Sequence, residues 1–218
     1  MDDHIDYYIL IPSHHPRCNP VIDFVMQKNI LMINGHPNAD SFCQAINDAY
    51  KKGVSGSDAN FREILIRDLD FDLNLAYGYQ KRTELESDLL KAQEKIQWAD
   101  HIVWVFPVWW GSYPAIMKGF IDRVFLPGFA FKKRENSVWW DKYLTGKTAR
   151  IISTLDQPAW YYRWVNGRPT YHSMKKMTCG FVGIKNVKFT TVGSLRLSTE
   201  EYRKKWLDKI EELGRKTQ

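Results

Sequence analysis

From Asn29 onward, the sequence alternates between short apolar runs rich in β-branched residues and longer segments with a helical period. The apolar runs predict strands at 30–33, 61–66, 101–106, 149–154 and 187–192, and the periodic segments predict helices at 42–52, 84–98, 114–125, 170–179 and 199–214. This alternation favours a parallel sheet that is covered by helices on both faces. We therefore predict an α/β fold with one doubly wound domain over residues 28–218.

The third predicted strand supports a sheet that is covered on both sides. Residues 102–106 read I-V-W-V-F, an apolar run without polar alternation. A strand that is buried on both faces shows this pattern. In doubly wound sheets, ligands bind beside the carboxyl ends of the strands. The loops that follow the predicted strands are therefore expected to carry the functional residues.

Residues 1–27 lack this alternation. They are interrupted by three prolines, namely Pro12, Pro16 and Pro20, and proline does not fit the interior of a regular helix. We expect this segment to form an extension outside the core domain. It also contains four residues of types that bind metals, namely His4, His14, His15 and Cys18. Their spacing matches no zinc motif, so we predict no metal site.

Charge and cysteine usage restrict the class of protein further. The net charge of +6 favours anionic partners such as phosphate-bearing cofactors, but the basic residues are scattered in short groups, so we predict no nucleic-acid binding. Cys18, Cys43 and Cys179 lie far apart, which favours a reducing, cytoplasmic location. The longest apolar run, 102–110, is shorter than the roughly 20 residues of a membrane span, so we predict no membrane insertion.

The first informative loop, 33–46, follows the first predicted strand. Ser41 is expected to cap the next helix, Gln44 to complete a capping box, and Gly53 to end the helix. The loop thus brings a helix N-terminus to the sheet edge, where its free N–H groups, with His36 and Ser41 as further donors, suit an anion. The loop is neither a G-x-G-x-x-G nor a P-loop motif, and the same capping pattern also occurs without any ligand.

Two of the nine tryptophans stand in the connection after the third predicted strand. Pro107 cannot donate a hydrogen bond to a sheet, so we expect the strand to end at Phe106, and Pro114 fits the first turn of the next helix. Trp109 and Trp110 lie in the short segment between these prolines, where core packing does not easily hide both. Flat rings at this position suit a planar ligand or an apolar interface, although a large core also uses tryptophan.

The third loop, 152–164, follows the fourth predicted strand. It offers Thr154, Asp156, Tyr161 and Tyr162 to the same crevice. The alternative interpretation is a rigid loop whose aromatic residues only cover the sheet.

Together, these loops resemble the NAD(P)H:quinone oxidoreductase (DT-diaphorase-like) family. The resemblance rests on G-H-P-N-A-D-S-F after the first strand, F-P-x-x-W-x-x-x-P-A-x-x-K-G-F-I-D-R-V-F after the third, then G-F-A-F, and S-T-x-x-x-P at the end of the fourth. It extends from about Asn29 to the C-terminus. It implies a flavodoxin-like fold with a five-stranded parallel sheet in the order 2-1-3-4-5 and helices on both faces.

The resemblance also implies roles for individual residues. The segment that holds the phosphate side of a flavin matches His36, Ser41, Phe42 and Cys43. The loop that cradles the isoalloxazine matches Pro107, Val108, Trp109, Trp110 and Gly111, with a second loop at Thr154, Leu155 and Asp156. Tyr161 keeps the spacing of a tyrosine near the flavin and is the candidate catalytic residue. Cys43 could be a reactive thiol or a small buried side chain.

Three departures from the family pattern stand out. The segment L-D-Q-P replaces the usual glycines after Thr154, and Trp109 stands where some relatives have glutamine. A histidine that follows the tyrosine in some relatives has no match, because Asn166 and Gly167 occupy that region. The segment that contacts the adenine of FAD matches poorly, so the resemblance implies FAD and leaves FMN possible.

By this resemblance, the chain is expected to pass a hydride from NAD(P)H, through flavin N5, to a quinone or similar planar acceptor in a ping-pong sequence. A homodimer is expected, with Gly128, Phe129, Ala130, Phe131, Trp139 and Trp140 as candidates for the wall that one protomer gives its partner's pocket. Two alternatives stay open: a flavodoxin-like electron carrier, and a flavin-binding regulatory subunit of a membrane channel or transporter.

Overall fold

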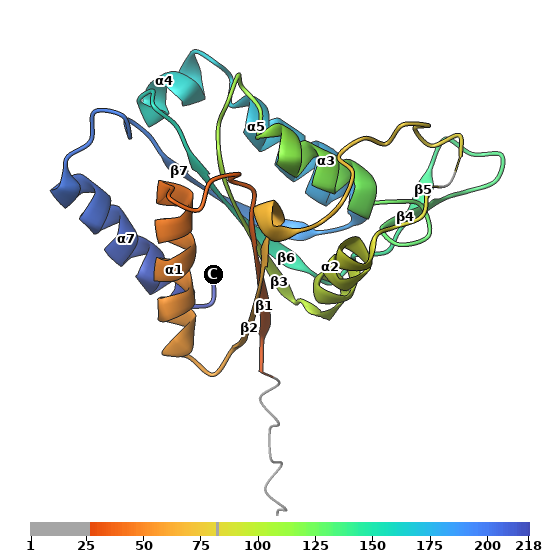
Figure 1. Cartoon of the computed structure of the whole chain (residues 1–218), viewed down its shortest axis with the longest axis horizontal. Helices are drawn as coiled ribbons and strands as arrows, with labels where there is room; N and C mark the ends of the chain where they lie inside the picture. Colours follow the sequence, from red (N-terminus) through yellow and green to blue (C-terminus); the bar gives the residue numbers. More distant parts are fainter. Residues whose placement is uncertain (1–26, 82) are drawn as a thin grey trace, which may run out of the picture.

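Five parallel strands form the central sheet of the computed structural model, which describes residues 27–81 and 83–218 (Figure 1). Across the sheet, the strands are β2 (Asn60–Leu65), β1 (Asn29–Asn34), β3 (His101–Pro107), β6 (Thr148–Thr154) and β7 (Lys185–Val192). Numbered along the chain as the five strands of this sheet, their order is 2-1-3-4-5. The predicted fold class and sheet order are confirmed.

All five predicted strands are present, with small shifts at their ends. Pro107 was expected to lie just outside β3 but is its last residue, paired in register with Thr154. The amide of Val108 then donates to the carbonyl of Thr154 at 2.7 Å, so the pairing continues past the proline. Because the N–H that proline lacks is not needed at this position, the strand accommodates it.

Helices α1 (Phe42–Ser55) and α7 (Glu200–Arg215) cover one face of the sheet (Figure 1). They pack very closely, because a Cβ added at Gly53 would lie 1.9 Å from the carbonyl oxygen of Glu211, and one at Gly214 would lie 2.2 Å from that of Tyr50. The prediction that Gly53 ends the helix is wrong. Gly53 instead allows the close contact with α7, and the helix ends at Ser55 with Gly56 as its C-cap.

The opposite face carries α2 (Ser87–Trp98), α3 (Ala115–Val124) and a continuous helical segment. That segment comprises α5 (Pro169–Tyr171), the π-helix η2 (His172–Cys179) and α6 (Gly180–Val182). The predicted helix at 170–179 therefore exists but is a π-helix over most of its length. The predicted helix at 84–98 begins later, at Ser87, because Glu86 has an extended backbone and is the N-cap. The side chain of Glu86 pairs with the buried guanidinium of Arg123 at 2.8 Å.

Four further elements have no counterpart in the sequence predictions. Strands β4 (Phe131–Lys133) and β5 (Trp140–Lys142) form an antiparallel hairpin that projects at the right of Figure 1. The short 3₁₀-helix η1 (Ile66–Asp68) follows β2, and α4 (Ala159–Trp164) lies within the predicted third loop. Each is too short to produce a recognisable period in the sequence.

The hairpin and its surroundings contain residues that were expected to form a wall of the partner protomer's pocket. Ala130 and Phe131 are buried in this protomer's own core, and Trp140 stacks on Phe181 with ring centroids 4.3 Å apart. These side chains are therefore occupied within one chain, which removes Ala130 and Phe131 from the candidate wall. Trp139 remains 66% exposed.

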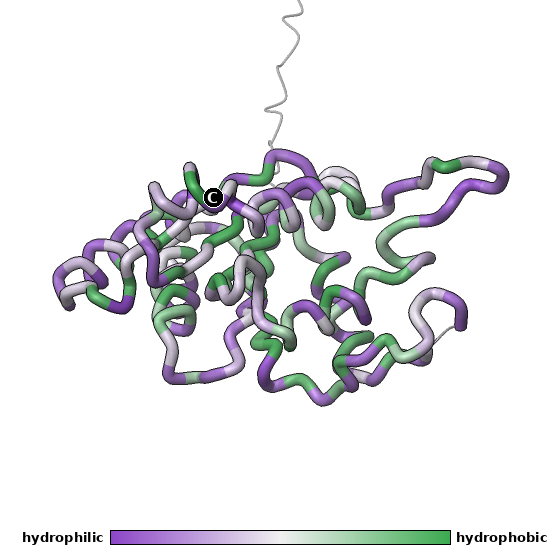
Figure 2. The backbone as a smooth tube through the Cα atoms, turned by 90° about the horizontal axis from the view of Figure 1, so that it is seen from above, coloured by the Kyte–Doolittle hydropathy of each residue, from purple (hydrophilic) through white to green (hydrophobic). Residues whose placement is uncertain are grey.

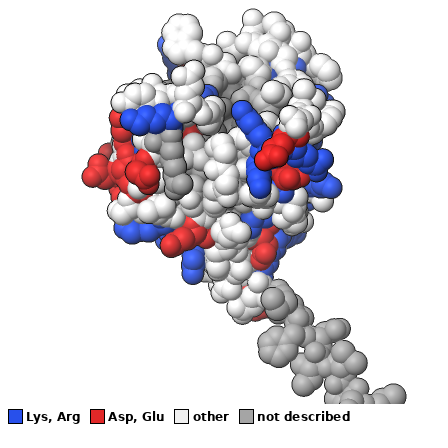
Figure 3. All heavy atoms as spheres, turned by 90° about the vertical axis from the view of Figure 1, so that its right-hand side faces the viewer, with Lys and Arg blue, Asp and Glu red and all other residues white. Residues whose placement is uncertain are grey.

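Hydrophobic segments concentrate in the interior of the molecule, and hydrophilic ones follow its periphery (Figure 2). On the face shown in Figure 3, Lys and Arg are interspersed with Asp and Glu. Within the described ranges, no helix is long and apolar enough to cross a membrane. The predicted extension at 1–27 and its four candidate metal ligands lie outside the described residues, apart from Gln27.

Candidate functional site

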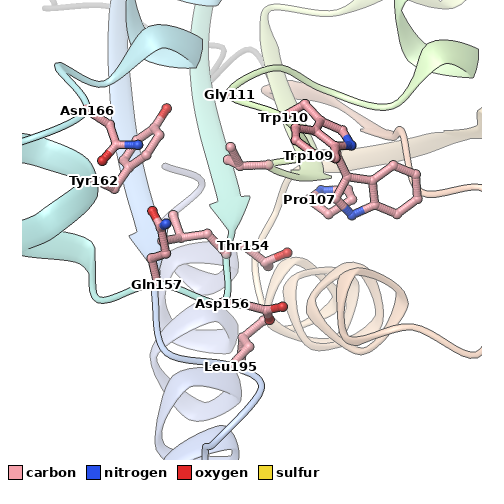
Figure 4. Close-up of a pocket in the computed structure, with 12 residues that line it drawn as sticks. Pro107, Trp109, Trp110, Gly111, Thr154, Asp156, Gln157, Tyr162, Asn166 and Leu195 are labelled. Carbon is pink, nitrogen blue, oxygen red and sulfur yellow. The ribbon is translucent and has the colours of Figure 1, made fainter.

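A cavity of about 670 Å³ opens at the carboxyl edge of the sheet (Figure 4). Eight of the predicted site residues line it, from two different loops: Pro107, Val108, Trp109, Trp110, Gly111, Thr154, Leu155 and Asp156. Four more residues line it: Gln157, Tyr162, Asn166 and Leu195. Tyr162 was expected at this crevice from the sequence, whereas Gln157, Asn166 and Leu195 were not assigned to the site. The second and third loops thus meet around one cavity, as the fold predicts.

A tight turn presents the two tryptophans. The amide of Trp109 donates to the carbonyl of Ser112 at 2.9 Å, and the amide of Ser112 donates back to Trp109 at 2.8 Å. The two residues between them have positive φ angles, 51° for Trp110 and 72° for Gly111, as in a type I′ turn. Glycine adopts this conformation readily, but tryptophan does so rarely. The turn leaves the Trp110 side chain fully exposed and Trp109 45% exposed.

The first predicted loop lies beside the cavity but does not line it. The ring of His36 packs edge-on against Trp109, with centroids 5.6 Å apart, and Nδ1 accepts a hydrogen bond from the Asn38 amide at 3.0 Å. Partial burial lowers the pKa of His36, so its neutral form, which this hydrogen bond requires, is favoured. The sulfur of Cys43 lies 3.5 Å from the hydroxyl oxygen of Thr154.

Cys43 behaves as a buried side chain. It is 1% exposed, and burial raises the pKa of its thiol to about 12. A thiol that stays protonated is a poor nucleophile, so the structure favours a small, buried side chain over a reactive cysteine.

Ser41 and Phe42 stand at the N-terminus of α1. Ser41 caps the helix by accepting from the amide of Gln44 at 3.2 Å, as predicted. The reciprocal half of the capping box is absent, because the Gln44 side-chain oxygen accepts from Arg67 at 2.9 Å and from Asn34 at 3.3 Å. This end of α1 therefore has a guanidinium beside it, which adds positive charge to the predicted anion position.

The loop after β6 is held by the loop after β7. Leu155 donates to the carbonyl of Val192 at 3.0 Å, Leu195 donates to the carbonyl of Leu155 at 3.2 Å, and Ser194 donates to the carbonyl of Gln157 at 2.9 Å. These bonds bring Leu195 to the cavity. The sequence could have indicated Leu195 as a site residue, because it follows the fifth predicted strand, whose carboxyl end lies beside that of the fourth.

Of the two adjacent tyrosines in α4, Tyr162 lines the cavity and Tyr161 does not. Tyr162 is 3% exposed, and its hydroxyl pairs with the Thr170 hydroxyl at 2.5 Å and accepts from the Thr170 amide at 3.0 Å. The ring of Tyr161 is 36% exposed and contacts Trp160 edge-on. A catalytic role for Tyr161 stays a prediction.

Comparison with known proteins identifies the family. The family described as having a flavodoxin-like fold matches residues 28–213. The chain belongs to this flavodoxin-like family.

Named relatives agree with the resemblance in the motifs. This flavodoxin-like chain is 33% identical over 147 residues to a ribosyldihydronicotinamide dehydrogenase (quinone) of Rattus norvegicus, which covers 63% of this chain and 62% of the relative. It is 28% identical over 186 residues to an uncharacterized NAD(P)H oxidoreductase of Haemophilus influenzae, which covers 83% of this chain and 91% of the relative. These names confirm the predicted resemblance to NAD(P)H:quinone oxidoreductases.

A solved structure shows the same fold. Smu.1420 of Streptococcus mutans superposes with a TM-score of 0.74 at 29% identity, over 86% of this chain and 99% of that one. The chain spans less than two thirds of the length of several curated relatives that it matches, for example 29% of one and 62% of the rat protein.

The lining of this flavodoxin-like site fits a flat, polar-edged cofactor. Its volume lies within the usual range for small-molecule sites, and three aromatic rings face it, those of Trp109, Trp110 and Tyr162. Within the described residues, no hydrogen bond uses the amide N–H of Trp110, Gly111, Asp156 or Gln157. These donors are free beside the cavity to bind the carbonyl and ring-nitrogen edge of an isoalloxazine.

Proposed function

We propose that this chain is a flavin-dependent NAD(P)H oxidoreductase that reduces a quinone or a similar planar acceptor. The observation that carries the proposal is the cavity at the carboxyl edge, where exposed tryptophan rings and unpaired amide donors come together. The overall reaction is NAD(P)H + H⁺ + quinone → NAD(P)⁺ + hydroquinone, so two electrons move and one proton comes from solvent. A bound flavin would supply N5 as the acceptor of a hydride from NAD(P)H and the donor to the quinone.

The chain's own residues position the rings. Trp109 and Trp110 offer flat surfaces for stacking, and the free amides of the turn and of residues 156–157 fix the orientation of a ring edge. The phosphate end of the cofactor lies, in this proposal, at the N-terminus of α1, near His36, Ser41, Phe42 and the Arg67 guanidinium. We favour FAD on the family resemblance and keep FMN as the alternative.

In this proposal, both co-substrates enter the cavity through the same opening. The cavity has the loops after β3, β6 and β7 as its walls, and NAD(P)H and the acceptor enter at the same side. Two planar rings that need the same stacking surface exclude each other, which gives alternating, ping-pong turnover.

A homodimer is part of the proposal. Large apolar side chains stand exposed on the cavity wall and on α4, including Trp110, Trp160 at 61% and Trp164 at 73%. Exposed apolar surface of this kind is typical of protein interfaces. Light scattering of the purified chain checks it, and a monomer at every concentration would contradict the dimer.

Steady-state turnover tests the function. The protein, reconstituted with flavin, is assayed for NADH and NADPH oxidation with menadione, against an equal amount of free flavin. We expect quinone-dependent oxidation well above the free-flavin rate, with parallel double-reciprocal lines as donor and acceptor are varied. Converging lines would contradict the ping-pong order, and a rate no higher than that of free flavin would contradict the function.

A further inference from the structure

Among the residues that the structure describes, Asp156 is the only aspartate or glutamate that lines the cavity, and no lysine or arginine lines it. The remaining lining side chains are apolar, aromatic, or neutral and polar. The described residues thus give this cavity one formal charge, and it is negative. This contrasts with the chain as a whole, which carries a net charge of +6.

The backbone on both sides of Asp156 is fixed. Leu155 exchanges backbone hydrogen bonds with Val192 and Leu195, and the carbonyl of Gln157 accepts from Ser194. Gly193 also lies close, because a Cβ added there would sit 2.8 Å from the carbonyl oxygen of Gln157. Asp156 therefore projects from a segment that is held at each neighbour, and Figure 4 shows it between Leu195 and Thr154.

The carboxylate of Asp156 is free. The residue is exposed, and in the described part of the chain its side chain has neither an ion pair nor a hydrogen bond. Elsewhere in the molecule, Asp48 accepts from Gln44, and Asp68 pairs with Arg67. A carboxylate without a protein partner in a ligand cavity is available to a positively charged group of the ligand.

Aromatic rings reinforce this charge preference. Trp109, Trp110 and Tyr162 line the same cavity as the carboxylate. The faces of aromatic rings attract cations through their quadrupole, and a nearby carboxylate adds direct attraction. The same carboxylate repels an anionic group that lies close to it. The combination is typical of sites that recognise flat cations.

We propose that Asp156 makes this cavity select cationic planar electron acceptors over anionic ones. The proposal rests on the proposed function, and it names the class of acceptor that the site takes. It also assigns the segment L-D-Q-P a purpose: the aspartate that stands in place of glycine sets the charge of the pocket.

Paired acceptors test the selectivity. Two 1,4-naphthoquinones are compared, one with a trimethylammoniomethyl and one with a sulfonatomethyl substituent, with the same donor throughout. In a ping-pong sequence, kcat/KM for the acceptor does not depend on donor oxidation, so the ratio of the two values isolates the acceptor. We expect the cationic quinone to be preferred, and Asp156→Asn to lower the cation-to-anion ratio roughly three- to tenfold.

The matched control is Asp58→Asn. Asp58 is exposed in the turn between α1 and β2, and its substitution changes the net charge by the same amount. We expect it to leave the ratio unchanged, and added salt to reduce the preference of the parent protein. An unchanged ratio in Asp156→Asn, or an equal change in Asp58→Asn, would overturn the proposal.

A binding measurement separates this proposal from the proposed function. Two redox-inert ligands, N-methylquinolinium and naphthalene-2-sulfonate, are titrated into the flavin-loaded protein and its variants by calorimetry. We expect tighter binding of the cation, and loss of that preference in Asp156→Asn. This result would support the proposal even if both quinones were inactive, which would count against the proposed function alone. A preference retained in Asp156→Asn would overturn it.

Discussion

The two edges of the sheet use their polar groups differently. At the amino edge, side chains bond to backbone or to one another: Lys28 donates to the Thr217 carbonyl at 2.6 Å, Lys147 donates to the Ala99 carbonyl at 2.6 Å, and His101 pairs with Thr148 at 2.7 Å. At the carboxyl edge, an exposed tryptophan in a strained turn and a free carboxylate border an open cavity.

This difference separates stability from ligand binding. Groups that are paired within the chain stabilise the fold, whereas strained or unpaired groups are tolerated where a ligand supplies the missing partner. Substitutions at the closed parts of the molecule are therefore expected to change stability first, and substitutions at the cavity to change binding first.

The largest effect on stability is expected at the contact between α1 and α7. Gly53→Ala places a Cβ 1.9 Å from the carbonyl oxygen of Glu211, so the helices must separate, and we expect the free energy of unfolding to fall by about 3 kcal/mol. Urea denaturation measures it. Gly56→Ala is the control, because its nearest neighbour is 3.5 Å away and its φ is −92°. Equal stability of both variants would contradict the close packing.

The buried tyrosine of the cavity wall is expected to have an intermediate effect. Tyr162→Phe removes the hydroxyl that pairs with the buried Thr170, so we expect a loss of about 1–3 kcal/mol in the free energy of unfolding. Tyr161→Phe is the control, and its hydroxyl has no such partner among the described residues. If Tyr161→Phe lowers kcat without loss of stability, the predicted catalytic role gains support; unchanged kcat would contradict it.

The buried histidine of the amino edge is expected to give a small, pH-dependent effect. Burial, with the nearby charges of Lys28, Arg150 and Lys188, lowers the pKa of His101 to about 3. Below about pH 6.5, the histidine is protonated in the unfolded state but stays neutral in the folded state. The free energy of unfolding therefore falls as the pH drops from about 6.5 toward 3, by at most about 1.4 kcal/mol per pH unit.

The substitution His101→Asn removes this titration and keeps an amide that can reach Thr148. Urea denaturation at pH 7.0 and pH 5.5 should therefore show a smaller acid-induced loss in the variant than in the parent. His172→Asn is the control, since His172 is exposed. An identical loss in the parent and in His101→Asn would show that His101 does not contribute.

The sequence was sufficient to predict the sheet and two of the loops that form the walls of the cavity. Apolar runs without alternation mark buried strands, and Pro107 and Pro114 frame the loop with Trp109 and Trp110 closely enough to place it. These signals are local, so they can be recognised without knowledge of tertiary contacts.

The remaining features depend on contacts between distant residues. Whether Tyr161 or Tyr162 faces the cavity depends on the rotation of a six-residue helix, and adjacent helical side chains point about 100° apart. Leu195 reaches the site through a hydrogen bond to Leu155. The need for glycine at position 53 comes from the close contact with α7, which lies far along the chain. No periodicity in the sequence encodes such pairings.

The central claim is that the carboxyl edge holds a flavin on Trp109 and Trp110. The direct measurement is the visible spectrum of the purified or reconstituted protein, with chromatography of the released chromophore, for the parent, Trp110→Ala and Trp98→Ala. We predict one flavin per chain in the parent, weaker retention in Trp110→Ala and parent-like retention in Trp98→Ala, because Trp98 lies on α2. Absence of bound flavin after reconstitution with FAD or FMN would contradict the claim, and equal retention in both variants would contradict the role of Trp110.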